Sequence, residues 1–158
     1  VLLRQLRAAG LDGAKQTLLS TVVSENEIDG IGKDNAVGYY ACMGYFQSLK
    51  NPVNERFVKA FKAKYGQERV IGDPMECAYN SVHLWKLGVE KAKTFDPMKV
   101  IAASGGIEID APEGTVRIHA TNHHVWKKVR VGRALPDGQF EIVWESPKLI
   151  EPNPFPKL

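Results

Sequence analysis

Thr17–Val23 (TLLSTVV) is followed directly by Ser24-Glu25-Asn26-Glu27, and this stretch decides the class of fold. The short apolar run is rich in β-branched residues, which is typical of a buried strand. A serine followed three residues later by a glutamate is a capping box, so a helix should begin after Ser24. A buried strand that leads into a capped helix favours an α/β fold with a parallel sheet.

The segments around this stretch continue the alternation of helices and strands. Leucines at helical spacing predict a helix over Val1–Ala9, and the apolar run Ala36–Phe46 predicts a second strand. Three further helices should begin at pairs that combine a capping residue with a first-turn proline: Asn51-Pro52, Asp73-Pro74 and Asp96-Pro97. Glu76 stands at the third helical position after Asp73, so this pair also fits a capping box.

Two of these helices have apolar stripes at helical spacing. The stripe of the first helix consists of Val53, Phe57, Phe61 and Tyr65, and the stripe of the helix Met75–Ala92 consists of Tyr79, Val82, Trp85 and Val89. Apolar residues that share one face of a helix normally pack against a core. Each stripe therefore marks the apolar face of its helix.

From Ile107 onward the apolar residues recur at every second position. This period predicts half-buried antiparallel strands at Thr115–His119, His124–Val131 and Gln139–Glu145, with a turn at Pro136-Asp137-Gly138. The sequence therefore predicts an α/β fold with an antiparallel addition at its C-terminal end.

The composition bounds the class of protein. The 158 residues are 44% hydrophobic and 25% charged, which is typical of a folded globular chain. The net charge of +3 is too small and too scattered to favour a nucleic-acid partner. Two cysteines, Cys42 and Cys77, exclude a disulfide framework and a cysteine-rich zinc site. They could pair with each other in an oxidising compartment or serve as two buried small hydrophobes.

Few residues point to catalysis or to metal binding. The sequence has no nucleophile elbow, dinucleotide fingerprint or phosphate-binding loop. His119 with Asn122-His123-His124 could form a two-histidine metal site across a hairpin, but neighbouring residues of a strand face opposite sides, which favours surface histidines. Asp110 and Glu113 could form a pair of catalytic carboxylates, but the intervening Ala111-Pro112 favours a loop. We expect no catalytic residue, metal or cofactor.

Aromatic residues crowd the second predicted strand. Tyr39, Tyr40, Tyr45 and Phe46 could form the wall of a ligand cleft or could pack in the core. Since Tyr39 and Tyr40 point to opposite faces of a strand, at most one of them faces any given cleft. Glu76 likewise has two interpretations, as half of a capping box or as a residue that faces a ligand.

An ordered series of segments resembles the type I periplasmic binding fold: LRQLRAAGL (residues 3–11), SENEI (24–28), AVGYY (36–40) and NPVNERFVKAFKAKYG (51–66). Four later segments are similar to the C-terminal part of the urea and short-chain amide binding proteins of ABC importers: DAPEGTVRI (110–118), NHH (122–124), DGQFEIVWESP (137–147) and EPNPF (151–155). The resemblance covers almost the whole chain.

The resemblance implies a C-terminal fragment of a longer protein with two α/β lobes joined by a hinge. Val1–Phe46 and Gly114–Leu158 would belong to the second lobe, and Gln47–Glu113 would be the helical part of the first lobe, with no sheet to pack against. The isolated chain should therefore be only marginally stable or expose a large apolar patch. We expect a signal peptide upstream of Val1 and a periplasmic or lipid-anchored extracytoplasmic location.

The resemblance also suggests ligand-binding residues. Relatives that bind amino acids place an acid before the glycine of the A-x-G stretch, where this chain has Val37 before Gly38. A neutral residue suits an uncharged ligand, because burying an unpartnered charge is unfavourable. Tyr39 would form a cleft wall. The helix that follows Asp73 starts near the cleft in this fold, which adds Pro74, Glu76 and Tyr79 as candidates.

The function implied by the resemblance is that of a non-catalytic receptor. It would bind urea or a short-chain amide between two lobes and deliver it to the membrane permease subunits of an ABC importer. Three alternatives stay open: a cytoplasmic amide-sensing regulatory protein of the same fold, an amide-hydrolysing enzyme that uses Glu76 or Asp110, and a stand-alone interaction domain.

Overall fold

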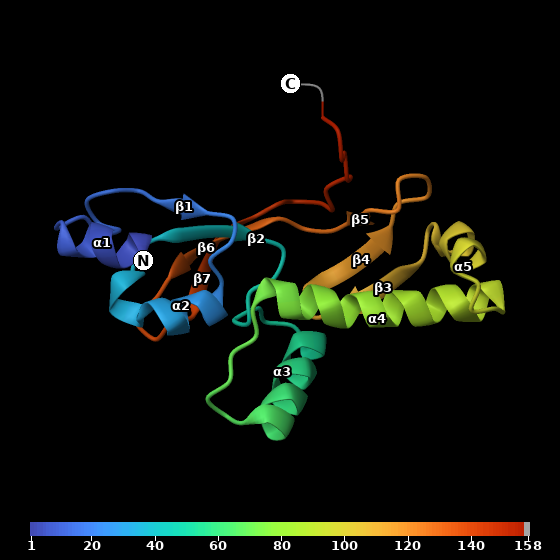
Figure 1. Ribbon diagram of the computed structural model, residues 1–158, viewed down its shortest axis with the longest axis horizontal. Coiled ribbons are helices and arrows are strands. Elements are labelled where there is room, and N and C mark those ends of the chain that lie inside the picture. The colour runs from blue at the N-terminus through green and yellow to red at the C-terminus, as the bar shows by residue number, and fades with distance from the viewer. Residues whose placement is uncertain (157–158) are drawn as a thin grey trace.

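The computed structural model describes residues 1–156, whose strands form two separate sheets side by side along the long axis of the molecule (Figure 1). One sheet has four strands in the order β1-β2-β6-β7, and the other has three in the order β3-β4-β5. Helices pack on both sheets, so the predicted α/β class is confirmed.

The four-stranded sheet contains one parallel pair. β1 (Leu19–Ser20) runs parallel to β2 (Tyr40–Met43). β6 (Arg130–Ala134) pairs antiparallel with β2, and β7 (Phe140–Glu145) pairs antiparallel with β6. The helices α1 (Leu2–Ala8) and α2 (Glu25–Ile31) contribute to its core, whereas a short 3₁₀ helix after α2, η1 (Lys33–Asn35), has no buried residue. This core includes buried residues of both helices and of the sheet: Leu3, Ile28, Ala41, Phe46 and Phe140.

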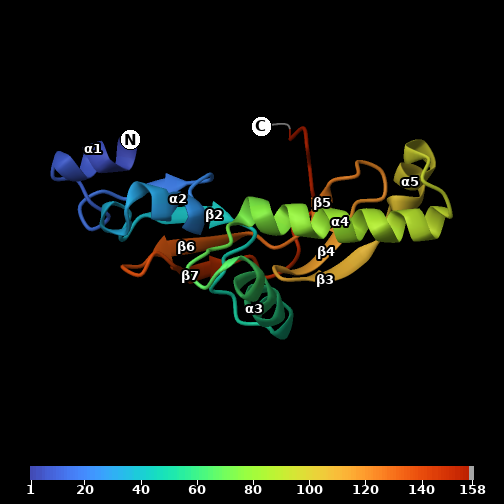
Figure 2. The same ribbon diagram turned by 60° about the horizontal axis from the view of Figure 1, so that its bottom comes forward.

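The three-stranded sheet consists of β3 (Glu108–Ala111), β4 (Gly114–Ile118) and β5 (Val125–Trp126), all antiparallel. The long helix α4 (Asp73–Ala92) runs along this sheet, and α5 (Pro97–Ser104) lies at its far end, while α3 (Pro52–Tyr65) projects from the junction of the two sheets (Figure 2). Leu84 of α4 packs on Ala111, Val116 and Ile118 of the sheet.

The capping residues in the sequence correctly predicted where most of the helices begin. The capping box of Ser24 and Glu27 is present, and the Asn51 and Asp96 side chains accept hydrogen bonds from Asn54 N and Lys99 N. The capping box expected at Asp73 and Glu76 is wrong, because Gly72 caps α4 without a side-chain hydrogen bond. Both acids bind groups from elsewhere in the chain instead.

The strands are shorter than the sequence predicts. β1 has two residues and β2 has four, inside the longer apolar runs. The expected strand His124–Val131 is split into β5 and β6, because residues 127–129 cross from one sheet to the other. β3 was not predicted, and it corrects the expectation that residues 47–113 contribute no strand, since β3 pairs with β4.

This pairing also bears on the division into lobes. We expected residues 114–158 to belong with residues 1–46, but β4 and β5 lie in the three-stranded sheet with β3. The break between the sheets therefore falls between Trp126 and Arg130 rather than before Gly114. Lys157 and Leu158, which end the assigned range, lie outside the described residues.

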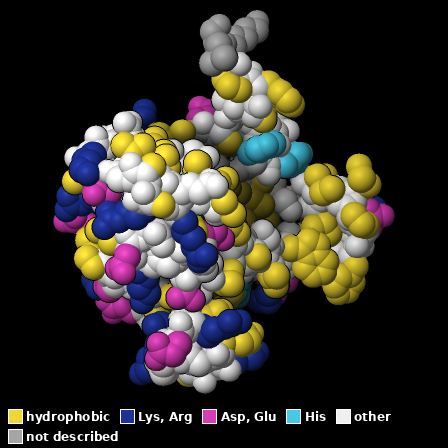
Figure 3. All heavy atoms as spheres, turned by 60° about the vertical axis from the view of Figure 1, so that its left-hand side comes forward, with side chains coloured by type: hydrophobic (Ala, Val, Ile, Leu, Met, Phe, Trp, Pro, Cys, Tyr) yellow, Lys and Arg dark blue, Asp and Glu magenta, His cyan; other side chains and the backbone are white. Residues whose placement is uncertain are grey.

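The apolar stripe of α4 does not face the interior of this chain. Val82 is 66% exposed and Trp85 is 53% exposed, while Leu84 on another face of the helix is buried. Figure 3 shows hydrophobic side chains gathered at the end of the molecule that carries α5, where Phe95 and Met98 are also exposed. The expected exposed apolar patch is therefore present.

In the part of the chain that the structure describes, no helix combines the length and the apolar character needed to cross a membrane.

Candidate functional site

The parallel strands β1 and β2 define the edge of the sheet where a ligand is expected. In α/β sheets, ligands bind in the crevice outside the carboxyl ends of parallel strands. Because β1 and β2 run in the same direction, the residues that follow them, 21–24 and 44–45, meet at one edge. We call these residues, together with the start of α4 at 72–73, the carboxyl edge.

Backbone contacts fix the start of α4 at the carboxyl edge. Asp73 Oδ1 accepts hydrogen bonds from Gly44 N at 3.0 Å and from Tyr45 N at 2.7 Å. A Cβ atom on Gly72 would lie 2.3 Å from Ser24 Oγ, so only glycine allows α4 to begin this close to α2. Asn26 also donates to Val70 O at 3.2 Å. The first turns of both helices therefore lie beside the ends of β1 and β2.

The exposed side chains after β1 are uncharged. Ser20 Oγ accepts hydrogen bonds from Val22 N and Val23 N, each at 3.2 Å, and this turn leaves Val22 75% exposed. Thr21 is exposed beside it. No residue from 17 to 23 is ionisable. This part of the carboxyl edge offers a hydroxyl group, backbone groups and a small apolar surface.

Glu25 lies under this surface and is buried. Its Oε1 accepts a hydrogen bond from Gln47 N at 2.7 Å, and its Oε2 has no hydrogen-bond partner. Burial raises the pKa of Glu25 to about 7, and the charges of Asp73 and Glu27 act in the same direction. This acid therefore already binds the protein backbone and is not available to an exposed ligand.

A group of five ionisable residues joins the two sheets: Asp73, Glu76, Glu113, Lys127 and Arg130. We call it the junction cluster. Glu76, Glu113 and Arg130 are buried, and Asp73 and Lys127 are partly buried. Arg130 donates from Nη2 to Glu113 O at 2.9 Å, from Nε to Glu145 at 2.7 Å, and from Nη1 to Gly44 O. Lys127 Nζ lies 3.3 Å from both carboxylate oxygens of Glu113, with hydrogen-bond geometry toward Oε1. The cluster thus connects β2, α4, the β3–β4 turn and the segment between β5 and β6.

Glu76 is the most buried acid of the junction cluster. Its Oε1 accepts hydrogen bonds from Asn80 Nδ2 at 2.7 Å and from Glu113 N at 3.1 Å. Burial raises the pKa of Glu76 to about 8, and the neighbouring charge of Glu113 adds to this effect. Burial also raises the pKa of Glu113, although Lys127 opposes the shift. Burial lowers the pKa of Lys127, but the charges of Glu113 and Asp73 outweigh burial and raise it, so Lys127 is charged.

One side-chain group has the proximity of metal ligands. Glu76, Cys77 and Glu113 each place one potential ligand atom within 4.8 Å of the others. Lys127 Nζ lies 3.6 Å from Cys77 Sγ and 3.3 Å from Glu113. Its ammonium group therefore already supplies the positive charge that a metal ion would bring to these side chains. The histidines form no such group within residues 1–156, and His119 instead accepts hydrogen bonds from Thr121 N and Asn122 N.

The structure separates the residues expected to bind ligand. Val37 and Gly38 precede β2 and lie at its amino end, opposite the carboxyl edge, where Gly38 packs on the Gly13 backbone. Tyr39 is buried in the core, and its hydroxyl donates to Leu11 O at 3.3 Å. Pro74 lies in the first turn of α4 near the carboxyl edge, and Glu76 lies in the junction cluster.

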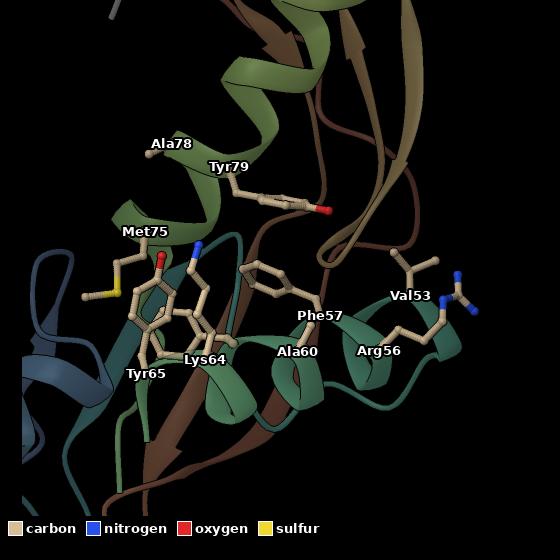
Figure 4. A pocket seen from close by; sticks show the side chains of 10 residues that line it. Val53, Arg56, Phe57, Ala60, Lys64, Tyr65, Met75, Ala78 and Tyr79 are labelled. Carbon is tan, nitrogen blue, oxygen red and sulfur yellow. The ribbon is translucent and has the colours of Figure 1, made fainter. Parts of the chain in front are cut away.

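Tyr79 lies at a third location, in a groove between α3 and α4 (Figure 4). The groove has a volume of about 700 Å³ and is largely apolar. The Tyr79 ring packs on Phe57 with 4.6 Å between ring centroids. Thus the six predicted residues form no single site. Val37, Gly38 and Tyr39 lie at the amino end of β2, whereas Pro74, Glu76 and Tyr79 lie along α4, and their role in binding stays a prediction.

Sequence reasoning missed Thr21 and Val22, which are the exposed residues of the carboxyl edge. A signal for them was present, because they end the apolar run that predicts β1, and ligands bind beyond such strands. It also missed Lys127, whose partner Glu113 is 14 residues away along the chain. No local pattern identifies that pair.

The sequence and the fold both match known proteins. The family described as "Periplasmic binding protein domain" matches residues 1–158. A protein of Geobacillus stearothermophilus named limonene hydroxylase is 36% identical over 124 residues, which cover 78% of this chain and 23% of that protein. Leu/Ile/Val-binding protein homolog 6 of Brucella abortus (strain 2308) is 25% identical over 109 residues, which cover 68% of this chain and 28% of that protein.

Solved structures show the same arrangement. A solute-binding protein of an ABC transporter from Rhodopseudomonas palustris, in complex with 4-hydroxybenzoate, is 26% identical with a TM-score of 0.75 over 96% of this chain and 42% of that chain. An amino acid ABC transporter substrate-binding protein from Pseudomonas fluorescens Pf-5 has a TM-score of 0.79 and 23% identity, again over 96% of this chain and 42% of that chain. The chain spans less than half the length of these proteins. It belongs to the periplasmic binding protein domain family.

Proposed function

We propose that this chain is part of the solute-binding receptor of an ABC importer and that a small solute contacts its carboxyl edge. The observation that carries this proposal is the position of Thr21 and Val22, which are exposed at the carboxyl ends of the parallel strands. The family match and the transport proteins among its structural neighbours support the receptor class. An extracytoplasmic location is part of the same proposal.

The chemistry of the carboxyl edge favours an uncharged solute such as urea or a short-chain amide. The residues after β1 include no ionisable side chain, and the nearby acids Glu25 and Asp73 already accept hydrogen bonds from the backbone. A solute with a net charge would have to be buried here without a partner from this surface, which is unfavourable. The argument for a neutral solute therefore rests on Val22 rather than on Val37, which lies at the opposite end of β2.

Binding would be coupled to movement at the junction of the two sheets. A solute that contacts both lobes only when they are closed stabilises the closed form. The segments that cross between the sheets, including residues 127–129, are the natural hinge. The closed receptor would then dock on the permease subunits.

The side-chain chemistry supports a receptor rather than a hydrolytic enzyme. Burial raises the pKa of the Cys77 thiol to about 11, which keeps it neutral and a poor nucleophile. The Ser24 hydroxyl donates to Glu27 within the cap of α2. Both groups have structural partners.

Two matched substitutions test where the solute binds. In the complete gene product, Val22→Asp should abolish the rise in melting temperature caused by urea or acetamide, because it places a charge at the binding surface. Val37→Asp, at the other end of β2, should leave that rise unchanged. The proposal is wrong if Val37→Asp removes the rise and Val22→Asp preserves it.

A further inference from the structure

We propose that Glu76 and Glu113 hold one proton between them at neutral pH, and that opening the junction between the two sheets releases it. The junction should therefore weaken as the pH rises. The inference does not depend on which solute the protein binds.

The geometry leaves several buried acceptors without a donor. Glu76 is 0% exposed and Glu113 is 3% exposed. The Oε2 atom of Glu76 lacks a hydrogen-bond partner, and the Oε2 atom of Glu113 has only the ion pair with Lys127 Nζ at 3.3 Å, without hydrogen-bond geometry. Asn80 Oδ1 is also buried without a partner, although Asn80 Nδ2 donates to Oε1 of both acids, at 2.7 and 3.3 Å. One carboxyl proton supplies a hydrogen-bond donor to this group of buried acceptors, and leaving a buried acceptor without a donor is unfavourable.

The charges around the pair lead to the same conclusion. From α4, Asp73 and the neutral thiol of Cys77 face the pair, and from the other side the cations Lys127 and Arg130 do so. Arg130 is paired with Glu145, which leaves Lys127 as the ammonium group shared by the three carboxyl groups Asp73, Glu76 and Glu113. Two buried carboxylates close together cannot both ionise easily. Burial and this repulsion account for the raised pKa of Glu76, about 8.

The pair lies where the proton can influence the junction. Glu76 accepts from the backbone nitrogen of Glu113, and Arg130 donates to the backbone oxygen of Glu113. A Cβ atom on Gly44 would lie 2.7 Å from Glu113 Oε2 and 2.6 Å from Lys127 Nζ, so the chain leaving β2 packs directly on these side chains. Opening the junction would expose both acids to water, where a glutamate has its ordinary pKa and releases the proton.

A bound metal ion is the competing explanation for the unsatisfied oxygens. Lys127 argues against it, because an ammonium group 3.3 Å from Glu113 and 3.6 Å from Cys77 repels a second cation. A proton adds one positive charge and needs no additional space. The experiment therefore also measures the effect of adding Zn²⁺.

The test measures the proton directly and then its effect. Infrared difference spectroscopy on the complete gene product carrying Glu25→Gln, which removes the other buried acid with a raised pKa, should show the band of a buried protonated carboxyl group at pH 7. Adding either Glu76→Gln or Glu113→Gln should remove this band. Hydrogen exchange of the Gly44 and Tyr45 amides, corrected for the intrinsic rate, should lose protection by about tenfold per pH unit between an ordinary glutamate pKa and pH 8. Glu76→Gln should flatten this dependence, while Glu90→Gln, an exposed acid of the same helix, should not.

Three results would overturn the proposal. The first is the absence of a protonated carboxyl band at pH 7 in the Glu25→Gln protein, in which Glu76 and Glu113 are both unchanged. The second is a pH dependence in Glu76→Gln that runs parallel to that of the unsubstituted protein. The third is loss of the band with a rise in protection on adding Zn²⁺, which would identify a metal site instead.

Discussion

Asp73 Oδ1 lies 2.7 Å from the backbone nitrogen of Tyr45 and accepts its hydrogen bond. The same oxygen accepts the hydrogen bond of Gly44 N at 3.0 Å. These contacts join the first residue of α4 to the residues that follow β2. They therefore hold the helix of one sheet against the strand end of the other, beside the surface that we propose for the solute.

Replacing Asp73 should show how much these contacts contribute. Asp73→Ala removes a charged acceptor from two backbone donors, and we expect the free energy of unfolding to fall by about 2–3 kcal/mol in urea denaturation. Asp73→Asn keeps an oxygen at the same place and should lose less. Equal losses for the two variants would show that the hydrogen bonds are not the source of the effect.

Lys127 should be a second essential contact of the junction cluster. Lys127→Met leaves the carboxyl group of Glu113 buried without its cation, and removing one partner of a buried pair typically destabilises by about 3–5 kcal/mol. Adding Glu113→Gln should restore much of this loss, because the unpaired charge disappears. A double variant with the sum of the two single losses would contradict the pairing.

Glu25 gives a prediction for the pH dependence of stability. Its pKa is raised, chiefly by burial, to about 7, so the folded protein holds this proton more tightly than the unfolded chain does. The free energy of unfolding should therefore fall as the pH rises from an ordinary glutamate pKa to about 7, by up to about 1.4 kcal/mol per pH unit. Glu25→Gln should remove this part of the dependence in denaturation curves recorded from pH 5 to 8. An unchanged slope would contradict it.

Gly13 should tolerate no side chain. A Cβ atom there would lie 2.4 Å from the backbone carbonyl carbon of Gly38, so Gly13→Ala must push two backbone segments apart, with an expected loss of about 1–3 kcal/mol. Gly30 in α2 is the matched control, because a Cβ atom there meets nothing within 4 Å. Gly30→Ala should stabilise by about 0.5–1 kcal/mol. Thermal denaturation of both variants distinguishes the two sites.

The sequence predicted those parts of the fold that depend on neighbouring residues. The caps at Ser24, Asn51 and Asp96 are formed by side chains that bind backbone groups three residues away, so a short pattern contains both partners. Asp73 has the same local pattern but a different role, because Gly44 and Tyr45 reach its carboxylate from 28 and 29 residues away. The hydrogen bonds from these distant residues replace the helix cap that the local sequence pattern predicts at Asp73.

The α4 stripe shows the same limit for burial. Its spacing correctly predicts the helix, but Val82 stays 66% exposed and Trp85 stays 53% exposed although its ring packs on Phe95. A periodic pattern identifies the apolar face of a helix, whereas the element that covers this face depends on the rest of the fold.

The candidate site was only partly predictable. Pro74 and Glu76 were expected near the ligand because a helix should begin there, and the structure does place that helix start at the carboxyl edge. Val37 and Gly38 were chosen by resemblance to a motif, and they lie at the amino end of β2. Locating the carboxyl edge required the direction of β1 relative to β2, which only the pairing of the strands reveals.

Isothermal titration calorimetry on the complete gene product tests the proposed receptor function most directly. We expect saturable binding of urea or a short-chain amide at one site, and no heat from leucine or 4-hydroxybenzoate under the same conditions. Binding of a charged solute alone, or no binding of any member of this panel, would contradict the account of a receptor for a small neutral solute.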